Sequence, residues 1–204
     1  MKFRKLMLVL TFTVSIIFVT VIGATYAYYN TSSGSIGGTT GNVGNPINVV
    51  FNNSDYVDFN VGVPISSSDV ETKASKTTFT LTPNNAIIND YDISADIMLS
   101  NIDIDNALKV SDFKYRLICT HSVTGNSQTF NGTGSSLNSN SYTIASLSTT
   151  NTGNDIFYID TNANSQNYSC TLYLWLEESG VSQNTLMGKH FGANIVVSSM
   201  MKKR

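Results

Sequence analysis

The feature that most constrains the fold is an alternation of apolar and polar residues with a period of two. It is clearest in residues 91–99 (YDISADIML), 113–119 (FKYRLIC) and 168–176 (YSCTLYLWL). Successive side chains of a β-strand point to opposite faces, so each run presents one apolar face and one more polar face. Strands of this kind bury their apolar faces against one another, which requires two layers of sheet.

Weaker runs of the same kind are separated by clusters of Asn, Ser and Gly. They cover residues 47–51, 57–63, 77–82, 127–133, 141–145, 155–159 and 193–197. The body shows no convincing 3.6-residue apolar period, and only residues 68–73 (SDVETK), with Ser and Asp as capping residues, indicate a short helical turn. We therefore expect an all-β protein, an antiparallel β-sandwich of jelly-roll type.

The N-terminal 27 residues have the composition of an export signal. A basic segment, Met1–Lys5, precedes seventeen uncharged residues, Leu6–Ile22. We expect a hydrophobic signal helix in residues 1–27, although a run of this length is also close to the minimum for an uncleaved membrane anchor. In both cases the positive residues stay in the cytoplasm and the body faces outward. The residues expected at the cleavage site are Thr25, Ala27 and Tyr28.

The rest of the chain is expected to form one domain that follows an arm. Residues 28–45 (YYNTSSGSIGGTTGNVGN) have too little apolar surface to offset the entropy of ordering them, which predicts a flexible arm. The alternating runs begin after Pro46. Residues 46–204 are therefore the predicted sandwich domain.

The charge of the body argues against nucleic acid as a partner. Residues 28–201 contain 14 acidic and 6 basic side chains, a formal charge of 6 − 14 = −8. Nucleic acids are bound by clustered Lys and Arg residues that displace counterions from phosphates. We expect no nucleic acid partner, and contact with a membrane only through the N-terminal segment before cleavage.

Two cysteines, Cys119 and Cys170, lie on the apolar phase of their predicted strands. In an exported chain such a pair is most simply a disulfide between neighbouring strands. It would close a loop of about fifty residues and stabilise the fold by roughly 3–4 kcal/mol. Two buried free thiols are the alternative.

The sequence shows no arrangement typical of an enzyme. Its two histidines, His121 and His190, have no zinc-binding spacing, and there is no G-x-S-x-G motif or glycine-rich phosphate loop. We therefore expect no catalytic residue and no cofactor other than a candidate calcium ion.

The calcium candidate is residues 101–106 (NIDIDN), where oxygen-bearing side chains alternate with isoleucine. Such oxygen ligands on one strand face can hold Ca²⁺ together with a loop. The same alternation is typical of the solvent side of a strand end, so both interpretations stay open. The candidate ligands are Asn101, Asp103 and Asp105.

Two segments resemble known proteins. Residues 21–30 (VIGATYAYYN) resemble the cleavage region of proteins processed by a SipW-type signal peptidase, with matching residues at Gly23, Thr25, Tyr26, Ala27, Tyr28 and Tyr29. Residues 168–197 resemble the closing hairpin of the TasA/camelysin group of biofilm-matrix and surface proteins. This resemblance implies a jelly-roll sandwich exported by a Gram-positive cell, often assembling into fibres by addition of an N-terminal strand to the next subunit. Some members carry a metalloprotease label, but this chain lacks the HExxH motif.

These features predict an exported structural subunit of a cell-surface or extracellular-matrix assembly that associates with itself. An extended segment can pair with the open sheet edge of a neighbouring subunit. The alternative for residues 47–51 is pairing within their own domain. The expected anchors of strand addition are Tyr28, Tyr29, Ile47, Val49 and Phe51.

The alternative function is a surface adhesin or a carbohydrate-binding module. Such a module presents exposed aromatic side chains grouped in one place. Tyr173 and Trp175 lie on the outward phase of the predicted strand at residues 168–176 and are the candidates for this platform. They would otherwise cover the second face of the sheet or meet a neighbouring subunit.

Overall fold

The structure is a computed structural model of the 204-residue chain, in which residues 31–33, 47–84, 91–148 and 167–203 are described. The predicted signal helix lies outside these residues, as does the predicted strand at 155–159. The same holds for the cleavage residues and two of the predicted anchors: Thr25, Ala27, Tyr28 and Tyr29. Within the described residues no helix is both long and apolar enough to cross a membrane.

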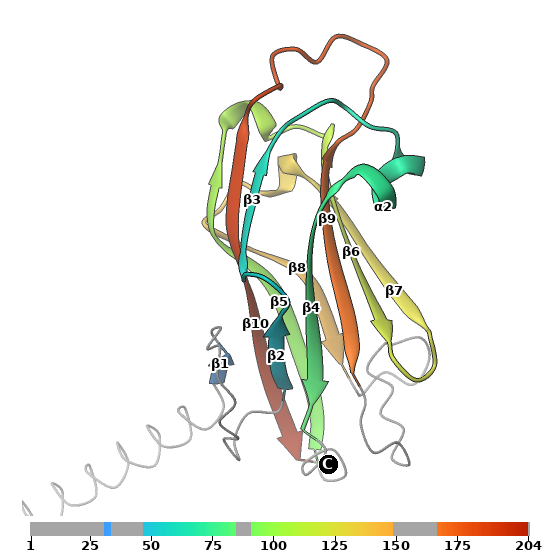
Figure 1. Cartoon of the computed structure of the whole chain (residues 1–204). Helices are drawn as coiled ribbons and strands as arrows, with labels where there is room; N and C mark the ends of the chain where they lie inside the picture. Colours follow the sequence, from blue (N-terminus) through green and yellow to red (C-terminus); the bar gives the residue numbers. More distant parts are fainter. Residues whose placement is uncertain (1–30, 34–46, 85–90, 149–166, 204) are drawn as a thin grey trace, which may run out of the picture.

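The described residues form two antiparallel sheets that face each other (Figure 1). Sheet A has the order β1-β10-β5-β8, with β3 also paired to β10, and sheet B has the order β2-β4-β9-β6-β7. The strands of sheet A are β1 (Thr31–Ser33), β3 (Tyr56–Asn60), β5 (Tyr91–Ile104), β8 (Ser141–Ser148) and β10 (His190–Lys203). Those of sheet B are β2 (Ile47–Phe51), β4 (Ser75–Pro83), β6 (Phe113–His121), β7 (Ser127–Thr133) and β9 (Tyr168–Leu176).

Within the described residues, helical structure is confined to short turns between the strands. The predicted turn at SDVETK is present as η1 (Ser67–Asp69) followed by α2 (Val70–Lys73). Two further turns, η2 (Asn106–Leu108) and η3 (Gly134–Ser136), lie in other connections. The prediction of an all-β protein with two antiparallel layers is thus confirmed.

The apolar phases predicted from the sequence form the core between the sheets. In β6 buried and half-buried residues alternate along the whole strand, as its sequence predicts. Phe113 from this strand stacks on Phe59 of sheet A at 5.8 Å between ring centroids and contacts Phe191 at 5.4 Å. Aromatic side chains therefore join the two layers near one end of the sandwich.

Strand β5 is longer than its predicted core of residues 91–99 because a bulge resets its alternation. Gly192 of β10 pairs with Asp103 and Asn194 pairs with Ser100, so β5 contains one extra residue at this point. Asn101 within the extra stretch has a φ of 50°, a left-handed conformation that asparagine tolerates. Beyond it Ile102 packs inward, and the strand continues to Ile104.

Gly132 of β7 provides space for a buried tyrosine, which leads to a prediction. A β-carbon at this position would lie 2.1 Å from the Cζ of Tyr115, whose side chain is buried. Gly132→Ala is expected to lower the free energy of unfolding by about 1–3 kcal/mol, because the packed ring has little room to move. Urea denaturation measures this change. Gly62→Ala, where no atom lies within 4 Å of the added carbon, is the control and should change stability little.

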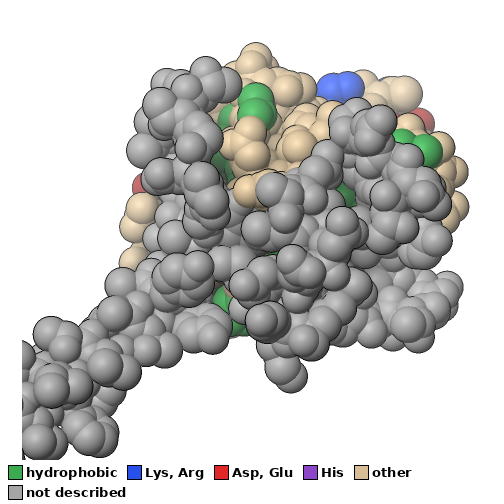
Figure 2. Space-filling view, turned by 90° about the horizontal axis from the view of Figure 1, so that it is seen from below, with side chains coloured by type: hydrophobic (Ala, Val, Ile, Leu, Met, Phe, Trp, Pro, Cys, Tyr) green, Lys and Arg blue, Asp and Glu red, His purple; other side chains and the backbone are tan. Residues whose placement is uncertain are grey.

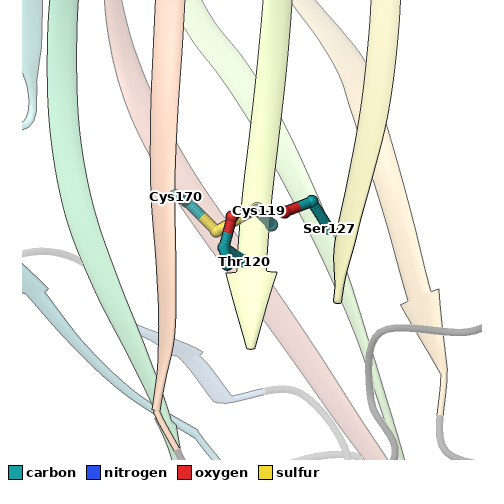
Figure 3. Close-up of a disulfide and its surroundings, with 4 residues drawn as sticks. All are labelled: Cys119, Thr120, Ser127 and Cys170. Carbon is teal, nitrogen blue, oxygen red and sulfur yellow. Dashed lines mark hydrogen bonds between the residues drawn. A yellow bond between two sulfur atoms is a disulfide. The ribbon is translucent and has the colours of Figure 1, made fainter. Parts of the chain in front are cut away.

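Cys119 and Cys170 form a disulfide with an S–S distance of 2.07 Å (Figure 3). They are directly opposite each other on the adjacent strands β6 and β9, and both are fully buried. Of the two interpretations that the sequence leaves open, the structure has the disulfide.

The segment predicted to be a flexible arm, residues 28–45, contains a strand. Thr31–Ser33 form β1, which pairs with Val197–Ser199 of β10. They are the described part of the predicted arm, whose flexibility stays a prediction. They can pair at this place because β3 pairs with β10 only as far as Asn194, so the next part of this edge has unpaired main-chain groups that an extended segment can satisfy.

Candidate functional site

The candidate assembly site is the edge of sheet A formed by β10. Two strands cover this edge in succession: β3 pairs with His190–Asn194, and β1 pairs with Val197–Ser199. Between them the amide of Ile195 donates to the carbonyl oxygen of Asp55 at 2.7 Å. The C-terminal part of this edge, Val197–Ser199, is therefore paired with β1, which lies far from it in the sequence.

The contact between β1 and β10 is small. It consists of three residue pairs, compared with five for β2 with β4 and five for β3 with β10. Ser199, which pairs with Thr31, is buried on the inward phase that it shares with Ile195 and Val197, and its hydroxyl has no hydrogen-bond partner among the described residues. A buried polar group without a partner costs about 1–3 kcal/mol, and this cost belongs to the core between the sheets rather than to the pairing with β1.

Three of the predicted strand-addition anchors belong to the chain's own sheet B. Ile47, Val49 and Phe51 lie in β2, which pairs with β4 along its whole length. Ile47 is fully buried, and the ring centroid of Phe51 lies 5.5 Å from that of Phe79. In the structure β2 thus pairs within its own domain, which is the alternative that the sequence leaves open, and its side chains pack on the domain's core. A role for these residues as anchors in a neighbouring subunit stays a prediction.

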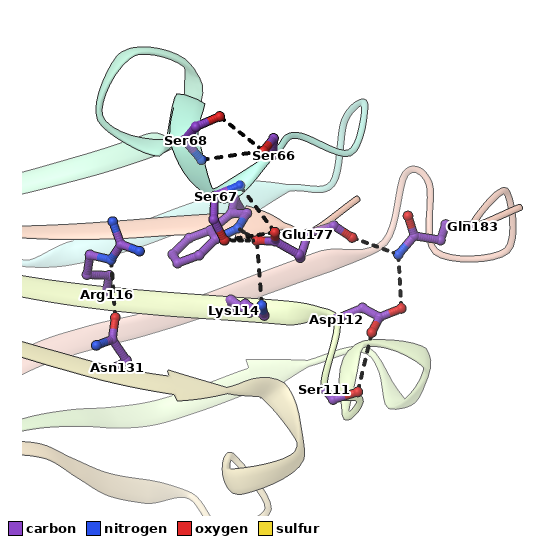
Figure 4. Close-up of polar contacts among 11 residues, drawn as sticks. Ser66, Ser67, Ser68, Ser111, Asp112, Lys114, Arg116, Asn131, Glu177 and Gln183 are labelled. Atoms are coloured by element: carbon purple, nitrogen blue, oxygen red, sulfur yellow. Dashed lines mark hydrogen bonds and ion pairs between the residues drawn. The ribbon is translucent and has the colours of Figure 1, made fainter. Parts of the chain in front are cut away.

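Glu177, directly after β9, is the centre of a polar cluster at the end of sheet B (Figure 4). Ser67 donates to the carboxylate from its amide at 3.1 Å and from its hydroxyl at 2.8 and 2.7 Å. Trp175 donates from Nε1 at 2.6 Å, and the Lys114 ammonium lies 3.6 Å away. These contacts hold the connection that contains η1 and α2 against sheet B.

A second polar contact joins the neighbouring loops to the same end of the molecule (Figure 4). Gln183, which is buried, donates from Nε2 to the carboxylate of Asp112 at 3.0 Å and to the backbone carbonyl of Glu177 at 2.9 Å. The backbone of Ile65 also pairs with that of Glu177 in a single parallel bridge. These polar groups position the loops at this end of the molecule.

The Glu177 cluster predicts a pH dependence of stability. Burial alone would raise the pKa of Glu177, but hydrogen bonds from Ser67 and Trp175 and the charge of Lys114 hold it below its ordinary value of 4.5. A lowered folded-state pKa contributes stability that is fully present above the unfolded-state value and is lost as the pH falls through the folded-state value.

Glu177→Gln is therefore expected to flatten the acid decline in the free energy of unfolding below about pH 4.5. At pH 7 it should cost about 1–2 kcal/mol, since charge-assisted hydrogen bonds are lost but water screens part of the effect. Urea denaturation between about pH 3 and 7, the range in which carboxylates titrate, measures both the acid decline and the loss of stability at pH 7. The exposed Glu178→Gln is the control. Parallel acid declines in the wild type and Glu177→Gln would contradict the prediction.

The proposed aromatic platform is not exposed as the alternative function requires. Trp175 has only 3% of its surface exposed, and the guanidinium carbon of Arg116 lies 5.4 Å from its ring centroid. Tyr173 is half-buried in the same strand. Trp175 therefore covers the second face of sheet B, which is one of the alternatives that the sequence leaves open.

The candidate calcium ligands contact different partners in the structure. The Asn101 amide donates to the Asn194 side chain at 3.3 Å, and the Asp105 carboxylate accepts from the His190 backbone amide at 2.8 Å. Asp103 lies 3.8 Å from Nδ1 of the His190 ring. Within the described ranges no group of three or more His, Cys, Asp or Glu side chains is placed to hold a metal ion. Calcium binding stays a prediction.

Sequence reasoning missed the β1–β10 pairing and the Glu177 cluster. Strand β1 has the sequence TSS, which contains no apolar alternation to reveal a strand. Ser67 and Glu177 are 110 positions apart in the chain, so no local motif connects them. The local sequence around Glu177, an acidic pair directly after an apolar strand, does not indicate this cluster.

Comparison with protein-family models, with curated proteins and with solved structures finds no match to this chain. The resemblance to the TasA/camelysin group therefore stays a prediction that depends on the two segments in which it was seen.

Proposed function

We propose that the protein is an exported structural subunit of a bacterial cell-surface or extracellular-matrix assembly, and that it associates with itself by strand addition. The proposal includes a signal helix in residues 1–27, cleavage by a SipW-type signal peptidase and a jelly-roll arrangement of the sandwich. It assigns the chain no catalytic role. The observation that carries it is the pairing of the isolated strand β1 with the edge of β10.

Strand β1 is suited to exchange between copies because its contact with β10 is between main chains. Hydrogen bonds of this kind form equally well with the same segment of another molecule. Residues 34–46, thirteen in number, join β1 to β2. A connection of this length spans up to roughly 45 Å when extended, which is enough to reach a neighbouring domain.

A neighbour's segment that continues past β1 would add main-chain pairs along the edge of β10. Addition of one subunit to the next by a head-to-tail contact does not close on itself, so it gives a filament.

Proline substitutions in β1 test the proposal. In an antiparallel strand, the N–H groups of every second residue point toward the partner strand. Proline removes the N–H group, so only one of two variants, Thr31→Pro/Ser33→Pro or Ser32→Pro, removes hydrogen bonds to β10. One of the two variants is expected to lose filaments while the other retains them, as judged by electron microscopy of the exported protein. Circular dichroism checks that both remain folded. If both variants form filaments like the wild type, strand addition through β1 is wrong.

The second candidate function, a carbohydrate-binding module, has one observation in its favour. An open hollow of about 520 Å³ lies at the end of the sandwich between β3, the start of β4 and the end of β9. Its lining combines apolar side chains with polar ones, including Phe59, Val63, Lys73 and Ser75. Binding to a glycan array that is lost in Val63→Asp would favour this function over a purely structural one.

A further inference from the structure

The two sheets carry opposite charges. The strands of sheet B contain three basic side chains, Lys76, Lys114 and Arg116, and no acidic one. Among the strand residues of sheet A whose side chains are described, three are acidic, Asp58, Asp96 and Asp103, and none is Lys or Arg. The sandwich is therefore acidic on one face and basic on the other, although its net charge is negative.

The acidic face of sheet A is exposed and has an aromatic ring on it. Asp58 and Asp103 have 61% and 81% of their side chains exposed, and they lie on either side of the His190 ring at 3.1 and 3.8 Å. Beside them Tyr56 lies across the sheet over Gly192, where a β-carbon would be 2.2 Å from the tyrosine Oη. Tyr56 remains 43% exposed. This part of the face combines accessible carboxylates with an apolar surface.

The basic face of sheet B has a matching arrangement. Tyr173 of β9 lies directly between Lys76 of β4 and Arg116 of β6 in the register of the sheet. Lys76 is exposed, and neither Lys76 nor Arg116 pairs with a carboxylate among the described residues. The Lys114 charge, in contrast, is offset by Glu177. Two cations thus flank the tyrosine; Lys76 is exposed, while Arg116 is half-buried, donates to the Asn131 side chain at 3.1 Å and lies over the Trp175 ring, and still carries a charge that no described carboxylate offsets.

Both charged areas lie toward the same end of the sandwich. Lys76 and Arg116 are close to the starts of β4 and β6, and Asp103 is close to the end of β5, all at the upper end in Figure 1. Figure 2 shows the lower end, where the visible charged side chains lie at the rim. If a second copy lies beside the first with the same end up, its acidic area is therefore at the same height as the basic area of the first copy.

We propose that the outer face of sheet A of one copy docks on the outer face of sheet B of the next, with both copies the same way up. This lateral contact is additional to strand addition and rests on the proposed function only in supposing that the protein associates with itself. Because the two faces differ, the contact is head-to-tail and forms an open row. Sheets pack roughly 10 Å apart, so each copy adds roughly 20 Å to the row.

A second copy fits these faces better than another partner does, because a single chain carries both complementary surfaces. A partner attracted to Lys76 and Arg116 would need its own exposed carboxylates, and Asp58 and Asp103 provide them. The net repulsion between copies is screened beyond roughly 8–10 Å at ordinary ionic strength, whereas close opposite charges still attract. Two copies therefore attract each other when the face of sheet A meets the face of sheet B, and they repel each other when two like faces meet.

Charge reversal tests this contact in the full exported protein. Asp58→Lys/Asp103→Lys makes the face of sheet A basic, and Lys76→Glu/Arg116→Glu makes the face of sheet B acidic. Each variant alone is expected to reduce lateral association at least roughly tenfold, measured by light scattering and by the width of filament bundles in electron microscopy. Lys109→Glu/Lys189→Glu, which changes the net charge of the chain by the same amount as Lys76→Glu/Arg116→Glu but lies outside the strands, is the control for that variant and should have little effect.

The decisive result is rescue. An equal mixture of the two variants restores both kinds of complementary contact, and so does one chain that carries all four substitutions, so lateral association should return in both samples. Failure of both to recover, with folding confirmed by circular dichroism, would overturn the proposal, as would an equal loss in the control variant. Single filaments that persist without bundles show that strand addition is intact. Absence of filaments in the wild type counts against the proposed function, and light scattering still reports the lateral contact.

Discussion

Replacing Cys119 and Cys170 by alanine is expected to lower the free energy of unfolding by about 4 kcal/mol. The two cysteines are 51 positions apart, and the cross-link removes the entropy of closing that loop from the unfolded chain. The disulfide also joins the two central strands β6 and β9 at a fully buried position. Loss of the disulfide therefore weakens the contact between β6 and β9, two adjacent strands in the interior of sheet B. Urea denaturation of the oxidised wild type and the variant gives the difference directly.

The control for this prediction uses the same chemistry without a mutation. Reduction of the wild type should lower its stability to nearly that of the alanine variant, and the reductant should leave the variant unchanged. The chain has no other cysteine, so no second disulfide complicates the comparison. A change below about 1 kcal/mol would show that the unfolded chain gains little freedom when the bond is absent.

Phe113→Ala is expected to lower the free energy of unfolding by about 3–5 kcal/mol. Phe113 comes from sheet B, but its ring packs on Phe59 and Phe191 of sheet A, with centroids 5.8 and 5.4 Å away. Its removal leaves a cavity between the two layers, and three strands border it. Chemical denaturation measures the loss, which should appear without a change in the number of transitions.

Two matched variants distinguish a loss of packing between the sheets from a loss of apolar surface alone. Phe113→Leu keeps most of the volume and should cost less than about 1.5 kcal/mol. Phe130→Ala removes the same group from the edge strand β7, where the side chain is only half-buried, and should also cost clearly less than Phe113→Ala. Equal losses for Phe113→Ala and Phe130→Ala would contradict the assigned position of Phe113 in the core.

Most of the strands can be predicted from the sequence because alternation is a local property. The residues that bury one face of β6, from Phe113 to Cys119, can be counted directly in the sequence. The bulge in β5 cannot, because it exists only in the register with β10. Strand β1 cannot either, since its three hydroxyl residues form a strand only where the open edge of β10 is available to them.

The candidate sites were less predictable than the fold because they depend on residues that the register brings together. Lys76, Arg116 and Tyr173 are distant in the sequence, and the pairing of β4, β9 and β6 places them in one row. For the same reason the apolar residues of β2 allow two interpretations in the sequence. Ile47 and Phe51 have the composition of an anchor for a neighbouring subunit, but the same composition suits the core of their own sheet.

The pairing of β1 with β10 of another copy can be tested by a cross-link between two single-cysteine variants. Ser32 and Ser198 are directly opposite in the register, at a separation that a disulfide can bridge. Both native cysteines are already paired, so Ser32→Cys and Ser198→Cys each add one free thiol. If strands are exchanged, mild oxidation of the mixed variants gives dimers that contain one copy of each. If only a chain carrying both substitutions becomes cross-linked, and only within itself, assembly by strand addition through β1 is contradicted.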